Sequence, residues 1–564
     1  MKRPCFILRC SAAFKGFGSL SFYKSCAALL LSLPLLILFP RQSEAQTVPF
    51  SSNLPIVVIT TKPGESIKNE PKITADMKII SHATGIRNFP ADPGNVYEGK
   101  VGIEIRGRYS ASLPQKPYGF ETRDASGNNV NISLLGMPAE NDWVLLANYN
   151  DKTFLRNVLA FELFRKMGNY SVRTRFCEVL LNNEYQGIYL LGEKIKQDSG
   201  RVNIAKLKPE DTQGDDVSGG YIIKTDYYTA SDSWMSYFSP VNKPGATVYF
   251  VYHDPDALEI TQQQKSYIQE YIKSLETVLY NPEFRSPVFG YTSYIDINSF
   301  ADYFIIGELS RNVDAYKKSR FFYKDKDSKG GILHSGPVWD MDWAFRNLKE
   351  NCIHMNKTDG SGWAYRINEC SASPTPPSWE VRMLQDKAFA NLVHTRYNEL
   401  RKTILSREHI EQIIDSVALL LSEAQSRHFD KWKILGINAG TPESGIQPLT
   451  YEGEITKLKS WLDTRLAWLD ANMVGAPLSA EDGEGSVLKC RVFPNPVSDR
   501  LFIESDQELK SLILISITGI IEEEQNNLSG YRVTVNTSGL KSGLYILTVE
   551  FRNGKKVSSR IVRE

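Results

Sequence analysis

Two aspartates separated by one residue are the feature of this sequence best suited to chemistry. They are Asp340 and Asp342, in the segment 337–345 (PVWDMDWAF). In a β-strand, side chains two positions apart share a face, so a strand here would present both carboxylates on one side. Neighbouring carboxylates repel unless a cation holds them, and Mg²⁺ binds few protein carboxylates together with phosphate oxygens. The spacing predicts a metal site; an amphipathic strand with a solvated acidic face, or a structural calcium site, is the alternative.

An asparagine and an aspartate follow a predicted helix earlier in the chain. The apolar residues of 296–309 recur with helical spacing, and Asn312 and Asp314 come directly after them, before a strand predicted at 319–323. A carboxylate in such a loop is suited to receive a hydroxyl proton, and an amide oxygen is suited to bind a metal. With the two aspartates above, these residues predict a phosphoryl-transfer site. Capping of the turn by Asn and Asp is the alternative.

Basic residues that suit phosphate groups occur where a strand, a loop and a second strand are predicted, at 105–121. Arg106 and Lys116 are the candidates for such contacts. An ordinary hairpin with solvated charges would contain the same residues.

Two glutamates occupy apolar surroundings. Glu162 falls on the apolar face of a helix predicted from Thr153, its N-cap, to Met167. Glu193 follows an apolar strand at 189–191. A carboxylate in such a place needs a partner, and for Glu162 we expect a lysine approaching from the strand layer. Surface positions are the alternative for both.

The elements that must position these side chains mix strands and helices without an obvious linker, which predicts one large α+β domain at 54–475. The N-terminal half is rich in β-branched and aromatic runs and the C-terminal half in helical periodicity. Strands are expected at 56–59, 101–106, 143–147, 176–181, 189–191 and 221–224, and helices at 153–167, 296–309, 379–404, 408–425 and 451–472. Asp296 and Ser406 are expected as N-caps.

A tail follows a linker predicted at 476–488, where Gly, Ser and acidic residues replace any periodicity. Residues 489–564 contain six short runs typical of strands, near 489–493, 500–505, 511–517, 531–536, 543–551 and 555–562, which predict a small β-sandwich. The segments FPNP at 493–496, ITG at 517–519, LKSGLYIL at 540–547 and SRIVR at 559–563 resemble the C-terminal sorting domain of type IX (Por) secretion cargo. That resemblance implies handling by the type IX secretion machinery and export to the outer cell surface or beyond. A carbohydrate-binding or other immunoglobulin-like module is the alternative.

The N-terminal residues 1–45 have the pattern of a secretory signal peptide, with basic residues before an apolar run at 27–39 and small residues before Gln46. The apolar run is shorter than the roughly 20 residues that span a bilayer, so we expect no transmembrane segment after cleavage. The whole chain has a formal charge of +1. Removal of this basic leader leaves a mildly acidic protein, which disfavours nucleic acid as a partner.

Cysteine usage agrees with export. Cys352 and Cys370 flank a polar segment rich in Gly, Ser and Asn. The sequence is consistent with two alternatives for this pair, a local disulfide or two free buried thiols. The sequence has no CxxC and no HExxH, which argues against a zinc site of Cys and His residues.

Six ordered segments of the large domain resemble the CotH kinase family, atypical secretory kinases related to spore-coat protein H. The segments are RG…KPYGFE at 106–121, LLGMPAENDWVLLANYNDKTFLRN at 134–157, YQGIYLLGEKIK at 185–196, RNVDAYKKSRFFYKD at 311–325, GPVWDMDWAF at 336–345 and WLDTRLAWLD at 461–470. The resemblance implies a divergent protein-kinase-like fold that binds ATP with Mg²⁺ or Mn²⁺ and phosphorylates Ser or Thr of exported proteins.

The resemblance also implies roles for individual residues. Asp314 would be the catalytic acid of the loop, and Lys116 would contact phosphate together with Arg106. Asp340 or Asp342 would hold the metal, with Asn312 and Glu193 in support; Glu162 is assigned to the nucleotide site from periodicity alone.

The chain also departs from familiar kinase patterns, because it has no GxGxxG, HRD or DFG segment. Gln115 stands where relatives often have a second lysine, and Arg346 where a glycine is common, so that Arg346 would either narrow the nucleotide pocket or contact a phosphate. A non-catalytic, pseudokinase-like scaffold or adhesin is therefore the alternative to an enzyme. A hydrolase of envelope polymers has only the paired acids in its favour.

Overall fold

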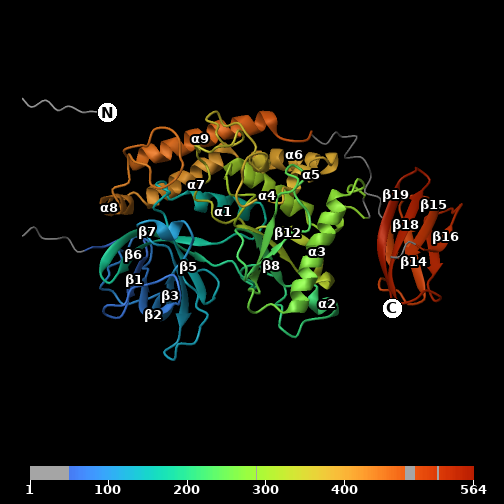
Figure 1. Ribbon diagram of the computed structural model, residues 1–564, viewed down its shortest axis with the longest axis horizontal. Helices are drawn as coiled ribbons and strands as arrows, with labels where there is room; N and C mark the ends of the chain where they lie inside the picture. The colour runs from blue at the N-terminus through green and yellow to red at the C-terminus, as the bar shows by residue number, and fades with distance from the viewer. Residues whose placement is uncertain (1–49, 287–288, 477–489, 517–519) are drawn as a thin grey trace, which may run out of the picture. The chain divides into compact units, whose positions relative to one another are not determined.

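The computed structural model describes residues 50–286, 289–476, 490–516 and 520–564. The predicted signal peptide, residues 477–488 of the predicted linker and the ITG segment at 517–519 lie outside the described residues. The large domain combines strands and helices, and the tail is made of strands (Figure 1). The predicted mixed class with a β-rich tail is confirmed, whereas the resemblance to a protein-kinase fold stays a prediction.

The first seven strands close into a barrel in the order β1-β2-β3-β4-β5-β7-β6, with β1 parallel to β6 and the other pairs antiparallel. Their bounds are Ile56–Thr60 (β1), Ile73–Ile80 (β2), Tyr97–Ile105 (β3), Tyr118–Arg123 (β4), Asp142–Ala147 (β5), Thr174–Leu181 (β6) and Glu184–Glu193 (β7). Val57 and Ile59 belong to the cluster that fills the barrel, while Ile56 and Val58 belong to a separate cluster. Burial on both faces explains why β1 is an unbroken apolar run.

A five-stranded sheet follows, in the order β12-β11-β8-β10-β9. Its strands are Tyr221–Thr225 (β8), Ser233–Met235 (β9), Tyr249–Asp254 (β10), Arg320–Lys324 (β11) and Leu333–Ser335 (β12). The aromatic ring of Trp379 packs against Phe250 of β10 and Phe322 of β11, with ring centroids 5.7 and 5.2 Å apart. Burial of these rings attaches the following helices to the sheet.

The helices are Arg156–Lys166 (α1), Gly214–Val217 (α2), Gln262–Tyr280 (α3), Ile297–Ser310 (α4), Trp379–Met383 (α5), Lys387–Arg401 (α6), Arg407–Leu420 (α7), Ala424–Lys431 (α8) and Tyr451–Asn472 (α9). In Figure 1 most of them gather above the barrel and the five-stranded sheet, whereas α3 runs beside the sheet. The side chains of Asp296 and Ser406 cap α4 and α7 as expected.

Two helix boundaries differ from the prediction for local reasons. Helix α1 begins at Arg156 and not after Thr153, because the Asp151 carboxylate accepts hydrogen bonds from the N–H groups of both residues. The helix predicted at 379–404 is broken into two, and Asp386 caps the second of them.

Helix α3 was not predicted, although its sequence carries a clear signal. Thr261 and Gln264 form a capping box, and Ile268, Ile272 and Leu275 follow with helical spacing on its buried face.

Cys352 and Cys370 form a disulfide, which decides between the two open alternatives in favour of a local cross-link. No helix in the described part of the chain is long and apolar enough to cross a membrane.

The tail is a sandwich of a three-stranded sheet, β13-β14-β17, and a four-stranded sheet, β16-β15-β18-β19. Its strands are Cys490–Phe493 (β13), Arg500–Ser505 (β14), Leu509–Ser516 (β15), Ile521–Gln525 (β16), Arg532–Asn536 (β17), Gly543–Phe551 (β18) and Lys556–Arg563 (β19). All six predicted strands are present. The additional strand, β16, is an edge strand with the sequence IEEEQ, whose three glutamates hide it from a propensity argument.

Candidate active site

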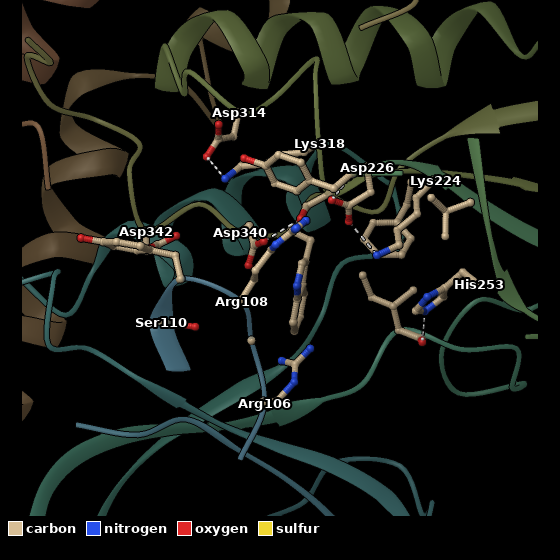
Figure 2. A pocket seen from close by; sticks show the side chains of 18 of the residues that line it. Arg106, Arg108, Ser110, Lys224, Asp226, His253, Asp314, Lys318, Asp340 and Asp342 are labelled. Atoms are coloured by element: carbon tan, nitrogen blue, oxygen red, sulfur yellow. Dashed lines mark hydrogen bonds and ion pairs between the residues drawn. The ribbon is translucent and has the colours of Figure 1, made fainter. Parts of the chain in front are cut away.

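A cavity of about 520 Å³ lies where the loop after β3 and the end of β7 face strands β8, β10 and β11 (Figure 2). Two further loops complete its wall, one between α4 and β11 and the other after β12. This volume falls in the usual range for small-molecule sites. The charged residues of the lining are Arg106, Arg108, Lys194, Lys224, Asp226, Asp232, Asp314, Lys318, Asp340 and Asp342.

Asp314 lines this cavity from the loop that follows helix α4. The helix ends at Ser310, Arg311 takes a left-handed conformation, and Asp314 follows on a short loop. Its two carboxylate oxygens form ion pairs with Lys317 at 3.2 Å and Lys318 at 3.0 Å. The candidate proton acceptor is thus present in the cavity, but its charge is balanced by two neighbouring lysines.

Asn312 connects the two acidic segments and does not line the cavity. Its Nδ2 donates to the backbone oxygen of Asp340 at 3.1 Å, and its Oδ1 accepts from the N–H of Asp314 at 3.1 Å. Because its amide oxygen is already used inside the turn, the structure does not place Asn312 as a metal ligand.

The segment 337–345 is an irregular loop and not the strand in which both carboxylates would share a face. Asp340 has a φ of 53°, a value outside the strand region, and the expected alternation of faces is lost. Trp339 and Trp343 line the same cavity as both aspartates, while Met341 is buried. Acidic and aromatic side chains are therefore brought to one site.

Contacts from α1 and the turn before it hold this loop in place. Asn157 accepts a hydrogen bond from the N–H of Met341 at 2.9 Å, and Arg156 donates to the carbonyl oxygen of Ala344 at 2.6 Å. Asn150 donates through Nδ2 to the carboxylate of Asp342 at 2.5 Å. These partners lie more than 180 residues away in sequence.

The negative charge of Asp340 affects the ionisation of Asp342. Burial, and then the negative charge of Asp340, raise the pKa of Asp342 to about 6. Asp340 accepts a hydrogen bond from the hydroxyl of Ser319 at 2.6 Å. A divalent cation would relieve the repulsion between the carboxylates, and hard oxygen donors of this kind suit Mg²⁺ or Mn²⁺. Within the described ranges no three or more His, Cys, Asp and Glu residues are grouped to hold a metal, so phosphate oxygens would have to supply other ligands.

The cavity also contains two guanidinium groups that have no carboxylate partner among the residues that the structure describes. Arg106 lies 5.4 Å from the ring centroid of Trp339, and Arg108 lies 4.2 Å from that of Tyr227. Burial lowers the pKa of Arg106, and the charge of Asp340 opposes this effect. Neither arginine forms an ion pair within the described part of the chain. Guanidinium groups that are not engaged in ion pairs are suited to bind phosphate oxygens.

The structure brings Arg106 into the cavity but not Lys116. The N–H of Arg106 donates to the carbonyl of Pro117 at 3.1 Å, and Pro117 lines the cavity. Lys116, one residue earlier, lines a separate pocket beside residues 60–67, and its Nζ donates to the carbonyl of Ala111 at 2.9 Å. Neighbouring residues of an extended chain point to opposite sides, which explains the separation.

The two glutamates also lie outside the cavity. Glu193 is fully buried and forms an ion pair with Arg173 at 2.5 Å, whereas the next residue, Lys194, lines the cavity. Glu162 pairs with Arg165 and Lys166 of its own helix, so the expected lysine from the strand layer is wrong. The spacings i+3 and i+4 in the sequence would have identified these partners.

Sequence reasoning did not single out Arg108, Lys194, Lys224 or Lys318 as members of the site. Arg108 belongs to the RGR segment that supplied Arg106, so the same argument applied to it. Side chains alternate between the two sides of an extended chain, so Lys194 lies on the opposite side from Glu193 and could have been identified in this way. For Lys224 and Lys318 no local signal distinguishes them from surface lysines.

The two departures from the expected family pattern have structural roles. Arg346 is buried and pairs with Glu443 at 3.2 Å, so it neither narrows the cavity nor faces it. Gln115 donates to the carbonyl oxygens of Gln186 and Ile188 and accepts from the N–H of Asn148. Both side chains satisfy buried polar groups behind the site.

A family of known proteins matches the large domain. Residues 103–469, more than half of the chain, match the family model described as CotH kinase protein. The chain belongs to the CotH kinase protein family. A curated relative, the inner spore coat protein H of Bacillus subtilis (strain 168), is 24% identical over 198 residues, which are 35% of this chain and 48% of that protein. The match thus spans about half the length of this CotH relative.

The tail of this CotH-family protein matches a second family model. Residues 491–564 match the secretion system C-terminal sorting domain, Por_Secre_tail. This match indicates handling by the type IX secretion machinery and a secreted or cell-surface location.

Proposed function

We propose that this protein is an exported, divergent kinase-like enzyme that transfers the γ-phosphoryl group of ATP, with Mg²⁺ or Mn²⁺, to a Ser or Thr hydroxyl of exported proteins. One observation carries the proposal: Asp314, Asp340 and Asp342 converge on one cavity that also contains two guanidinium groups, of Arg106 and Arg108, without an ion pair among the described residues. Phosphoryl transfer needs positioning and charge neutralisation more than covalent chemistry from the protein.

Each group of residues has a role in this proposal. Asp340 and Asp342 would hold the metal ion, which supplies charge neutralisation to the phosphates when bound. Arg106 and Arg108 bind and orient phosphate oxygens. Asp314 accepts the proton of the attacking hydroxyl through its carboxylate.

Labelled ATP tests the proposal directly. The full chain is incubated with γ-labelled ATP, Mn²⁺ or Mg²⁺ and a mixture of exported proteins, and compared with Asp340→Ala and Asp314→Ala. Glu162→Gln is the matched control, because it removes a carboxylate outside the cavity. We expect label transfer by the wild type and the control and a loss of at least 100-fold in the two alanine variants. Wild-type incorporation no greater than that of Asp340→Ala would refute an enzymatic role.

A nucleotide-binding scaffold without activity is the second candidate. It is favoured by the two ion pairs that engage both oxygens of Asp314. A ligand at 100 times its Kd stabilises a protein by about 2.7 kcal/mol, so a thermal shift with ATP and Mn²⁺ but no transfer would support the scaffold. Neither a shift nor transfer would exclude both candidates.

A further inference from the structure

The segment closed by the Cys352–Cys370 disulfide holds the residue that precedes the candidate catalytic loop. Arg311 is 1% exposed, and its guanidinium group donates three hydrogen bonds. Two go to backbone carbonyl oxygens inside the closed segment, those of Ser361 at 2.6 Å and Lys357 at 2.9 Å. The third goes to Oδ1 of Asn347 at 2.9 Å. The guanidinium group is thus hydrogen-bonded directly to the disulfide-closed segment.

A second set of contacts attaches the same segment to α4. The buried carboxylate of Glu308 accepts hydrogen bonds from two successive backbone N–H groups at 364–365, each at 2.8 Å. Arg465 of α9 donates to the carbonyl oxygens of Gly360 and Gly362 and forms an ion pair with Glu308 at 3.2 Å. The closed segment, α4 and α9 therefore form one buried polar assembly.

The backbone at Arg311 makes these contacts important for Asp314. Arg311 has φ 42° and ψ 41°, a left-handed conformation that non-glycine residues adopt at an energetic cost. Such a conformation persists where surrounding contacts fix it. Because this residue sets the direction in which the chain leaves α4, its anchoring determines where Asn312 and Asp314 lie.

We propose that Arg311 is a positioning residue for Asp314 and that the Cys352–Cys370 disulfide keeps the acceptors of Arg311 in place. Reduction by a dithiol transfers two electrons and two protons to the S–S bond, gives two thiols and leaves the dithiol as a disulfide. The released segment then no longer fixes Arg311, and the loop carrying Asp314 loosens. The chain would acquire its working geometry only in an oxidising compartment, after export. The catalytic meaning of Asp314 rests on the proposed function; its positioning does not.

Hydrogen–deuterium exchange measures the positioning without any assumption about activity. The full chain is compared when oxidised, when treated with dithiothreitol and as the double variant Cys352→Ser/Cys370→Ser. We expect backbone amides at 312–318, including the Asp314 N–H bonded to Asn312, to exchange at least tenfold faster without the disulfide. Amides of the barrel strands should be unchanged. Equal exchange at 312–318 in the oxidised and reduced chains would overturn the proposal.

Arg311→Gly provides a second test that leaves the disulfide intact and tolerates the left-handed backbone. We expect the same faster exchange, and a decrease in kcat of at least tenfold with less than a threefold change in KM for ATP. Arg366→Ala is the control, because this half-buried arginine of the same segment forms, among the described residues, a local ion pair with Glu369, at 2.7 Å. If the cysteine variant does not fold, Arg311→Gly decides: wild-type exchange in that variant refutes the positioning role. If the wild-type chain shows the exchange difference between its oxidised and reduced forms but transfers no phosphoryl group, the proposed function is refuted and the positioning role stands.

Discussion

Glu276 of α3 should make the stability of the large domain depend on pH. This side chain is 1% exposed and accepts hydrogen bonds from Ser236 at 2.7 Å and from the indole of Trp379 at 3.1 Å. Burial raises the pKa of its carboxyl group from 4.5 to about 7, against the effect of those hydrogen bonds. Because the folded state holds the proton to a higher pH than the unfolded state, stability is greatest below pH 4.5 and decreases as pH rises to about 7. At about 1.4 kcal/mol per pKa unit, the loss is about 3 kcal/mol.

Glu276→Gln should remove this dependence while keeping both hydrogen bonds, with its carbonyl oxygen accepting from Trp379 and its amide donating to Ser236. We expect the variant to match the wild type at pH 5 and to exceed its free energy of unfolding by up to about 3 kcal/mol at pH 8. Urea unfolding of the full chain at pH 5 to 8, followed by tryptophan fluorescence, measures the difference. Glu270→Gln, which alters an exposed carboxylate of the same helix, is the control. Parallel profiles for the wild type and Glu276→Gln, within about 1 kcal/mol, would refute the reasoning.

Two further predictions use pairs of matched variants. Arg106→Met should weaken ATP binding at least tenfold through the loss of a charge-assisted contact, whereas Lys116→Met should leave the Kd within threefold, because of the two only Arg106 lines the cavity. Calorimetric titration with ATP and Mn²⁺ measures both Kd values. Equal losses of affinity in the two variants would contradict the placement of Arg106 in the cavity and Lys116 outside it. Gly187→Ala should destabilise the large domain by about 2–4 kcal/mol, since φ is +100° and a Cβ would lie 2.8 Å from Nδ1 of His428. Gly136→Ala, with φ +75° but no atom within 4 Å of a Cβ, should lower the free energy of unfolding by about 1–2 kcal/mol less than Gly187→Ala does, as measured by urea unfolding. An equal loss in the two variants would show that the left-handed backbone, and not the contact with His428, causes the destabilisation.

Local sequence signals were sufficient for most elements that position the site. The unbroken apolar run of β1 and the capping aspartate of α4 act through residues within a few positions, so their structures follow from propensity and hydrogen bonding. The break at Asp386 shows the limit of periodicity, because a capping side chain inside an apolar pattern starts a new helix.

The loop that carries Asp340 and Asp342 was beyond such reasoning. Its composition would suit a strand, but no strand in the described part of the chain pairs with it, and its backbone is held instead by Asn157 and Arg156 from another part of the chain. Contacts across more than 180 residues leave no trace in local periodicity. Asp340 and Asp342 themselves line one cavity, and their residue types, not their backbone conformation, carried the prediction of a site. Their role as metal ligands stays a prediction.

The pairing of charges inside the cavity bears on how the proposed reaction would begin. Lys318 balances Asp314 and Lys224 balances Asp226, at 3.0 and 2.7 Å, so these acids and lysines satisfy one another. A polyphosphate would compete for Lys318 and Lys224, and a lysine that turned to phosphate would weaken the neutralisation of its carboxylate. Asp314 would keep its second ion pair, with Lys317, which does not line the cavity. Asp314 would then accept a proton more readily once a bound phosphate has drawn Lys318 away. Arg106 and Arg108, which form no ion pair with any described residue, would bind the phosphate first. A base that is neutralised until its phosphate donor arrives would have little tendency to activate water in the empty cavity.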